Sequence, residues 1–279
     1  MGLTVHWKFR APANMTPEGI KAICEKMRQH ALTLPFEQVD DKLIERIGTH
    51  DCNFENFRVQ KGEVETEEQA NLGWLLIQAS EYLRVPGPRG EKGTHYSFGV
   101  TPIHIIGFST WPAPGCESMN ISFAKFPETI ERYHNGKHRT YKTRKQGWTG
   151  RGFCKTQYAN EYGIPNFLRA HGCVISMLDK AKELDILKYV SDEGNYWTKR
   201  NAKELVKEIG EWDNMIAAFA GSLKDAVEGH GAELVAPILE RQDFEHLEME
   251  GRMKSKNLPK FLQMIKGLVK SPAGEKTGE

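Results

Sequence analysis

Apolar residues occupy every second position over residues 3–10, which predicts a half-buried β-strand. A helix is expected next. Thr16 suits its N-cap and Pro17 its first helical position, and apolar residues then recur at helical spacing until Pro35. The two elements together predict a helix that packs on a sheet.

Three further segments carry short apolar runs or alternating patterns, and each is interpreted as a strand. They are residues 72–79, 100–108 and 119–124. Turns rich in proline and glycine lie at residues 86–90 and 111–115. The first half of the chain is therefore expected to be mostly sheet.

The apolar spacing becomes helical after Pro165. It predicts one helix over residues 167–187 and a second over residues 198–227, with a turn at residues 191–194 between them. Two long amphipathic helices joined by a short turn are expected to pack antiparallel. A third, weaker helical pattern covers residues 258–269.

The predicted fold class is α+β, with a sheet-rich N-terminal half that carries a packed helix and a helical hairpin in the C-terminal half. The predicted division separates residues 1–163, which include a basic loop at residues 132–155, from a helical portion at residues 164–270. Residues 271–279 are expected to form a disordered tail. One continuous domain is the alternative, because 279 residues fit one large domain or two small ones.

Composition excludes some classes of protein. No apolar run approaches the roughly 20 residues that span a bilayer, so no membrane association is predicted. The five cysteines are scattered and form no Cys-x-x-Cys pair, which favours free thiols in the reducing cytoplasm over a disulfide framework or a zinc site. No metal ligands are predicted, and the cofactor and the oligomeric state stay open.

A basic segment stands out in a chain whose formal net charge is only +1. Eight lysines and arginines and no acidic residue lie between Arg132 and Asn160, interspersed with aromatic residues and glycines. This composition predicts a loop that binds an anionic partner, above all a phosphate. The alternative is that the acidic residues within residues 37–68 neutralise the segment inside the fold or across a dimer.

Within this segment, Arg151 and Lys155 adjoin the predicted helix and are expected to bind the ligand. The cations Arg139, Lys142 and Arg144 are expected to contribute little, because exposed charges interact weakly in water. The candidate ligand-binding side chains are Arg151, Lys155, Gln157, Tyr158, Trp148 and His104.

Two cysteines are candidates for nucleophilic catalysis. Cys116 lies in a turn with Glu117 beside it and with His104 as its candidate base, although a neighbouring carboxylate disfavours a thiolate. Cys154 precedes Lys155, whose positive charge is expected to favour the thiolate. Glu117 is also a candidate acid, base or metal ligand.

His171 is the fourth catalytic candidate. It shares the apolar stripe of the predicted helix at residues 167–187, where a hydrogen-bonded core histidine is the more frequent outcome. The positive N-terminal end of that helix would add to the attraction of an anion.

The motifs of the common nucleotide-binding and serine-hydrolase families are absent from the sequence. The leading hypothesis is a hydrolase or transferase that acts on a phosphate-bearing or otherwise anionic small molecule, in a cleft between the sheet and the helical hairpin. Whether the protein is an enzyme stays open. One alternative is a non-catalytic nucleic-acid-binding module that uses residues 132–158, and another is a structural protein with an acidic partner.

Overall fold

The computed structural model describes most of the chain, namely residues 3–57, 66–86, 95–134, 136–228 and 244–254. Its contacts divide the chain into two compact units, residues 1–200 and 201–279. The predicted α+β class is confirmed. The helix expected at residues 258–269 and the tail expected at residues 271–279 lie outside the described residues.

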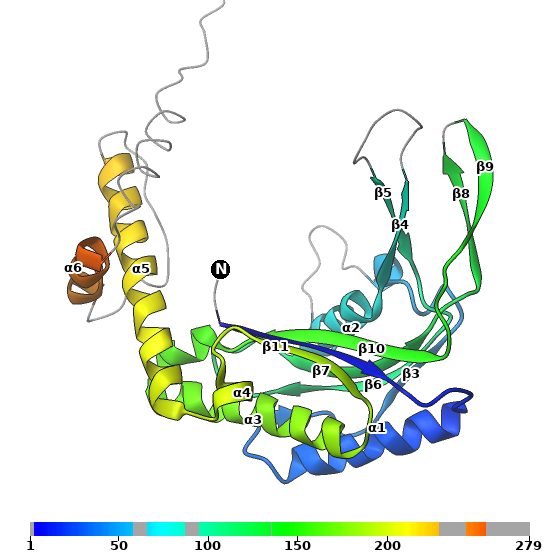
Figure 1. Ribbon diagram of the computed structural model, residues 1–279, viewed down its shortest axis with the longest axis horizontal. Helices are drawn as coiled ribbons and strands as arrows, with labels where there is room; N and C mark the ends of the chain where they lie inside the picture. Colours follow the sequence, from blue (N-terminus) through cyan, green and yellow to red (C-terminus); the bar gives the residue numbers. More distant parts are fainter. Residues whose placement is uncertain (1–2, 58–65, 87–94, 135, 229–243, 255–279) are drawn as a thin grey trace, which may run out of the picture. The chain divides into compact units, whose positions relative to one another are not determined.

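An antiparallel sheet of seven strands forms the centre of the first unit (Figure 1). Its strands are β1 (Thr4–Arg10), β2 (Gln38–Val39), β3 (Ile44–Ile47), β6 (His104–Trp111), β7 (Met119–Lys125), β10 (Trp148–Lys155) and β11 (Leu187–Asp192). Their order is β11-β1-β10-β7-β6-β2, and β3 also pairs with β6. The order places the first strand of the chain next to the edge strand β11, between two strands from the second half of the chain.

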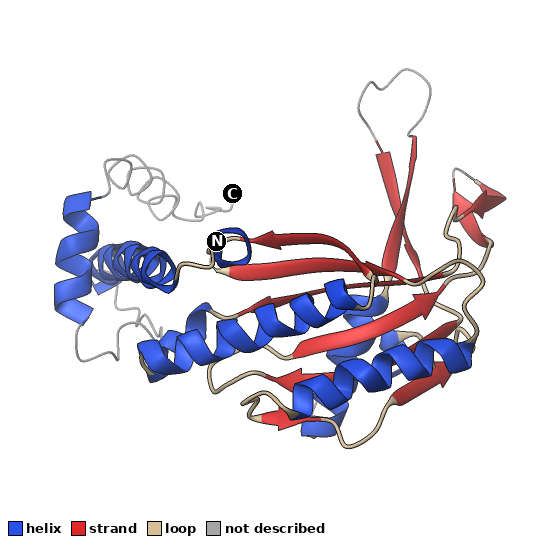
Figure 2. Ribbon diagram, turned by 60° about the horizontal axis from the view of Figure 1, so that its bottom comes forward, coloured by secondary structure: helices blue, strands red, loops and turns tan. Residues whose placement is uncertain are grey.

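Helices cover both faces of this sheet. Helices α1 (Pro17–Leu32) and α3 (Ile164–Glu183) pack on one face, and α2 (Glu67–Ala79) packs on the other (Figures 1 and 2). The sequence prediction of β1 and α1 is confirmed: the side chain of Thr16 accepts a hydrogen bond from Gly19 N, and Pro17 opens the helix.

The larger part of the core lies under α1 and α3. Trp7 and Phe9 of β1, Phe123 of β7 and Phe167 of α3 are all buried there. Burying each of these rings contributes about 1.5–3 kcal/mol. This face therefore holds the sheet in place, while α2 packs on the opposite face.

Residues 72–79 belong to α2, so the strand predicted for them is wrong. The helix begins at a capping box in which Thr66 accepts from Gln69 N and Gln69 Oε1 accepts from Thr66 N at 2.9 Å. An apolar run of eight residues fits a buried strand or two helical turns equally well, and the cap that decides between them lies further upstream. On α2, Leu75, Leu76 and Ala79 pack against Ala124 in a second apolar cluster.

The basic segment was predicted to be a loop, and this prediction is wrong. It forms β8 (Thr129–His134), β9 (Lys137–Lys142) and the central strand β10. Strands β8 and β9 pair as a two-stranded ribbon, and β4 (Glu81–Pro86) pairs with β5 (His95–Val100) as another. Both ribbons project from the sheet, in Figure 1 as in Figure 2.

The predicted hairpin of helices is interrupted by a strand. Helix α3 ends at Glu183, and β11 follows and pairs with β1 before the expected turn. The helical prediction ran too far because the apolar spacing continues past the point where Asp185, at φ +55°, ends the helix. Three short helices complete the first unit: η1 (Phe54–Phe57), η2 (Gln157–Tyr162) and α4 (Tyr196–Lys199).

The second unit contains α5 (Ala202–Glu228) and α6 (Phe244–Lys254). The two helices pack on each other, and Asn214 Nδ2 donates to Glu250 Oε2 at 2.8 Å. The second predicted helix of the hairpin therefore exists as α5. All residues of the site described below belong to the first unit.

Candidate ligand-binding site

Strands β7 and β10 separate beneath α2. Strand β10 pairs with β7 only at Trp148 and Thr149, whereas β7 pairs with β6 along the whole length of β7. At the other end, Glu117 N donates to Lys155 O and Lys155 N donates to Glu117 Oε2, both at 3.2 Å. The ladder pairing between β7 and β10 is therefore interrupted between these two ends, and we call this stretch the β7–β10 seam.

Helix α2 places an amide in the seam. Gln78 Nε2 donates to Phe153 O at 3.2 Å, which satisfies a carbonyl group of β10. Gly152 makes room for this contact, because a Cβ atom there would lie 2.4 Å from Cζ2 of Trp7 and 2.9 Å from Oε1 of Gln78. A side chain at position 152 would have to displace the indole or the amide.

Five buried side chains along the seam carry polar atoms that have no hydrogen-bond partner among the described residues. These atoms are Trp7 Nε1, Gln78 Oε1, Ser109 Oγ, Asn120 Nδ2 and Oδ1, and Ser122 Oγ. Each of the five residues is at most 5% exposed. Leaving such an atom unsatisfied costs about 1–3 kcal/mol, so solvent or a ligand is expected to supply the partners.

The sheet register explains why Ser109, Asn120 and Ser122 gather on the face that α2 covers. Ser109 of β6 pairs with Asn120 of β7, so the two side chains lie on the same face. Ser122 and Ala124 follow at alternate positions of β7, and Ala124 packs against α2. The α2 face of β7 is therefore polar at one end and apolar at the other.

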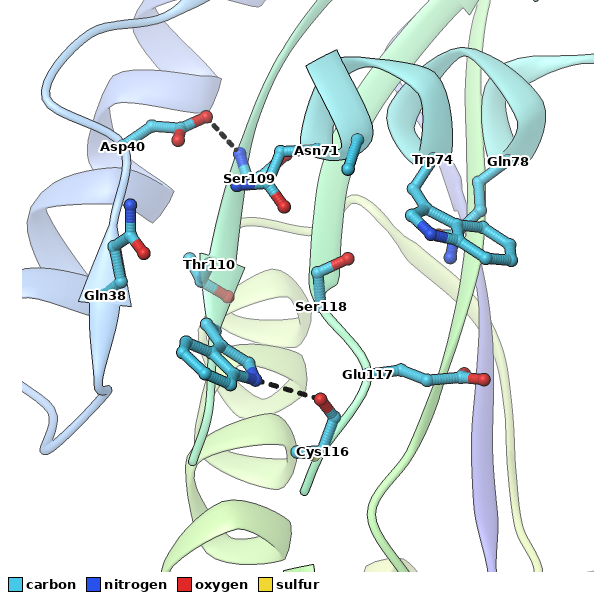
Figure 3. A pocket seen from close by; sticks show the side chains of 12 residues that line it. Gln38, Asp40, Asn71, Trp74, Gln78, Ser109, Thr110, Cys116, Glu117 and Ser118 are labelled. Carbon is cyan, nitrogen blue, oxygen red and sulfur yellow. Dashed lines mark hydrogen bonds between the residues drawn. The ribbon is translucent and has the colours of Figure 1, made fainter. Parts of the chain in front are cut away.

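A pocket of about 410 Å³ opens beside the polar end of this face (Figure 3). We call it the α2 pocket; its lining residues include Gln38, Asp40, Asn71, Trp74, Gln78, Ser109, Thr110, Trp111, Cys116, Glu117 and Ser118. Two tryptophans flank it, Trp74 at 46% and Trp111 at 37% exposure. Ser109 and Gln78 therefore belong both to the seam and to the pocket wall.

Two carboxylates lie on opposite sides of the α2 pocket, as Figure 3 shows. Asp40 Oδ2 accepts from Ser109 N at 2.7 Å, and Glu117 Oε1 lies 3.4 Å from Lys155 Nζ. No lysine or arginine is found among the described residues that line the pocket. Its charge is therefore unfavourable for a phosphate and suitable for hydroxyl donors.

Two of the predicted catalytic residues, Cys116 and Glu117, line the α2 pocket. The thiol of Cys154 lies behind them, with its Sγ 3.7 Å from that of Cys116. Burial, and next the hydrogen bond with Cys116, raise the pKa of Cys154 well above its ordinary value. The expectation that Lys155 favours the thiolate of Cys154 is wrong, because Lys155 forms an ion pair with Glu117 instead.

Cys116 is expected to be the first of the five thiols to react with iodoacetamide. It is 9% exposed and lines the pocket, whereas the others are at most 3% exposed. Burial also raises the pKa of Cys52 and of Cys173 to about 11, which reduces their thiolate fraction. Mass spectrometry of the native protein after brief labelling measures the order, and labelling of Cys154 as fast as Cys116 would contradict it.

His171 lies in the core. Its Nδ1 is 2.9 Å from Thr156 Oγ1 and its Nε2 is 3.4 Å from Asp192 Oδ2, and its side chain is fully buried. Both ring nitrogens therefore have partners from the fold itself. The structure does not bring His171 to the α2 pocket.

His104 and Trp148 lie on the α1 face of the sheet, with ring centroids 4.8 Å apart. His104 Nε2 is 3.0 Å from Glu45 Oε1, and Trp148 Nε1 donates to Met15 O at 3.0 Å. His104 begins β6, whereas Cys116 follows the other end of that strand. The proposed pairing of His104 as the base for Cys116 is therefore wrong.

Arg151 is held by backbone and carboxylate groups near the end of α2. Its Nε donates to Gln78 O at 3.2 Å, another guanidinium nitrogen donates to Ser80 O, and Nη1 lies 3.6 Å from Glu81 Oε2. It lines a second cavity of about 630 Å³ over β1, together with His6 and Lys8. Most of its donors are thus already used.

The last two predicted ligand-binding residues lie in η2. Gln157 is buried and Tyr158 is 46% exposed, and neither lines the α2 pocket. Gln78, Ser109 and Asn120 were not predicted from the sequence. A sequence signal existed for Ser109 and Asn120. Both are polar residues that alternate with apolar ones in strands that helices cover on both faces.

Comparisons of the chain with models of protein families, with curated proteins and with solved structures find no match. None of the helices described is long and apolar enough to cross a membrane. In the same described part of the chain, no group of three or more histidine, cysteine, aspartate or glutamate residues could hold a metal ion.

Proposed function

We propose that the protein binds a small, neutral, hydroxyl-rich molecule in the α2 pocket. One observation carries this proposal: Ser109 Oγ and Gln78 Oε1 are buried in the pocket wall without a partner among the described residues. Ligand pockets combine apolar walls with a few polar groups that fix the orientation of the ligand. Both side chains line the pocket, and a rotation toward it would bring these two atoms, which are buried in the ligand-free protein, into contact with the ligand.

The remaining lining supports the same class of ligand. Carboxylate oxygens of Asp40 and Glu117 accept hydrogen bonds from hydroxyl groups, and the amide of Asn71 both donates and accepts. The exposed rings of Trp74 and Trp111 offer flat apolar surfaces to the C–H face of a sugar or to a nucleobase. Sugars, polyols and nucleosides share this combination of groups.

The anionic ligand expected from the sequence is a second candidate, for the cavity over β1. Lys8 favours it: its ammonium lies 5.6 Å from the ring centroid of Tyr189, and among the described residues it forms no ion pair. A phosphate there would face Lys8 and His6. This cavity adjoins the α2 pocket at Gln78, which lines both.

The experiment is a thermal-shift panel of sugars, polyols, nucleosides and their phosphates. A neutral member at a hundredfold excess over its Kd is expected to stabilise the protein by about 2.7 kcal/mol. Trp74→Ala should abolish the shift, whereas Tyr133→Ala, at an exposed ring outside the pocket, should preserve it. Shifts with phosphate compounds alone, lost in Lys8→Gln and kept in Trp74→Ala, would move the function to the second cavity.

Catalysis at the α2 pocket is tested with the same ligand. Paired carboxylates are common acid–base groups in hydrolases, so Asp40→Asn and Glu117→Gln should abolish turnover if the ligand is a substrate. The ligand is incubated with the wild-type protein for a long time and then analysed for products. The result decides between catalysis and binding alone. An unchanged ligand would restrict the protein to binding.

A further inference from the structure

The ribbon of β8 and β9 concentrates cations that the fold does not neutralise. The side chains of Lys137, Arg139 and Lys142 of β9, and of Arg144 just after it, form no ion pair or hydrogen bond among the described residues. Neighbouring cations of the same basic segment are neutralised: Lys145 pairs with Glu81 at 3.2 Å. The cations of the basic segment therefore fall into two groups. Some pair with carboxylates of the fold, and the others face solvent or a partner.

The register of the ribbon places like charges directly opposite each other. Arg132 pairs with Arg139, so two guanidinium groups lie on the same face. Like charges at opposed positions destabilise an antiparallel pair. Among the described residues Arg132 has no carboxylate partner either, and its guanidinium donates to the carbonyl groups of Gly99 and Glu131.

Aromatic contacts with strand β5 support one face of the ribbon as far as its tip. The ring centroids of Tyr96 and His134 lie 4.2 Å apart, and those of Phe98 and Tyr141 lie 5.3 Å apart. On the opposite face, Tyr133 is 67% exposed and stacks edge-on with His138 at 5.2 Å. The cations are thus presented on a supported arm that projects from the sheet (Figures 1 and 2).

A two-stranded ribbon matches one kind of polyanion by shape. The major groove of B-form DNA is about 12 Å wide and admits a two-stranded ribbon, which places cations near the phosphates on both sides. Exposed tyrosine and histidine rings add contacts to sugars and bases. An acidic protein surface would satisfy the charge but would not require this narrow, projecting form.

We propose that the β8–β9 ribbon binds the major groove of double-stranded DNA, with Lys137, Arg139, Lys142 and Arg144 contacting phosphates. This interaction uses a surface separate from the α2 pocket and does not depend on its ligand. From the sequence, Arg151 and Lys155 were expected to bind the ligand, and Arg139, Lys142 and Arg144 were expected to contribute little. The proposal exchanges these roles. In the structure those two have partners within the fold.

The test measures fluorescence anisotropy of a labelled duplex, about two helical turns long, with the full chain over a range of salt. The variant Lys137→Gln/Arg139→Gln/Lys142→Gln/Arg144→Gln is expected to bind at least about tenfold more weakly at low salt. Its slope of log affinity against log salt should fall by about three to four, close to 0.9 for each lost phosphate contact.

The matched control removes the same charge elsewhere, in Lys26→Gln/Lys42→Gln/Lys188→Gln/Lys203→Gln. It should bind within about twofold of wild type, because these lysines are not on the ribbon. Far-ultraviolet circular dichroism of both variants must match that of the wild type. Four outcomes would overturn the proposal: no duplex binding by wild type, equal weakening in the control, tighter binding to single-stranded DNA, or binding to polyglutamate in place of DNA.

Discussion

Replacing His171 with alanine is expected to lower the free energy of unfolding by about 3–5 kcal/mol. The side chains of His171 and Asp192 are 0% and 2% exposed, so the substitution leaves a buried carboxylate without its ring partner and a cavity beside it. Chemical denaturation measures the loss. The matched control is His30→Ala, because among the described residues the side chain of His30 makes one hydrogen bond, to Ser176 Oγ at 3.1 Å, and its loss is expected to cost about 1 kcal/mol.

The same pair predicts a dependence on pH. Burial by itself raises the pKa of Asp192, but the hydrogen bond and charge of His171, and the backbone N–H groups of Trp197 and Gly194, outweigh it and lower the pKa. A carboxylate whose pKa is lower in the folded protein stabilises it above the unfolded pKa, about 3.9, and this contribution is lost as the pH falls through the folded value. The stability difference between wild type and Asp192→Asn should therefore shrink below about pH 4. A difference that grows in acid would contradict this assignment.

Two substitutions in the seam are expected to separate binding from stability. Asn120→Leu keeps the number of heavy atoms, and Ser109→Ala removes one oxygen; both delete polar atoms that have no partner among the described residues. The ligand-free protein should be unchanged or more stable by up to about 1 kcal/mol. Ligand affinity of Ser109→Ala should fall about 10-fold to 100-fold, because Ser109 lines the α2 pocket and the ligand then faces an apolar wall at that position.

The control for this pair is the neighbouring hydroxyl group. Thr110 Oγ1 donates to Met119 O at 3.0 Å, so Thr110→Val removes a bond that the fold makes and should cost about 1 kcal/mol of stability. Urea denaturation of Ser109→Ala and Thr110→Val gives the comparison. Equal losses in the two variants would mean that Ser109 Oγ has a partner within the fold.

Elements with a complete local signal were predicted correctly from the sequence. Strand β1 shows strict alternation, and α1 has both a cap and an apolar stripe. The signals for α2 and β11 were incomplete, because a short apolar run fits two structures and because helical spacing continued beyond Glu183. The ribbon of β8 and β9 was missed because its polar, exposed faces resemble a loop in composition.

The site was harder to predict than the fold because distant segments build it. The turn that carries Cys116 and Glu117 was selected from its composition, and both residues line the α2 pocket. Gln78 reaches the seam only because α2 docks over the point where two strands separate, and no local pattern encodes that event. The ion pair between Arg151 of β10 and Glu81 of β4 likewise depends on a contact between two strands that are distant in the sequence.

The most direct test of the central claim is a calorimetric titration of wild type and Ser109→Ala with the neutral ligand selected by the thermal-shift panel. The two proteins should bind with the same stoichiometry, and the Kd of Ser109→Ala should be at least about tenfold higher, which is about 1.4 kcal/mol. An equal Kd for the two proteins would contradict a ligand that contacts the unpartnered hydroxyl group of Ser109 in the α2 pocket.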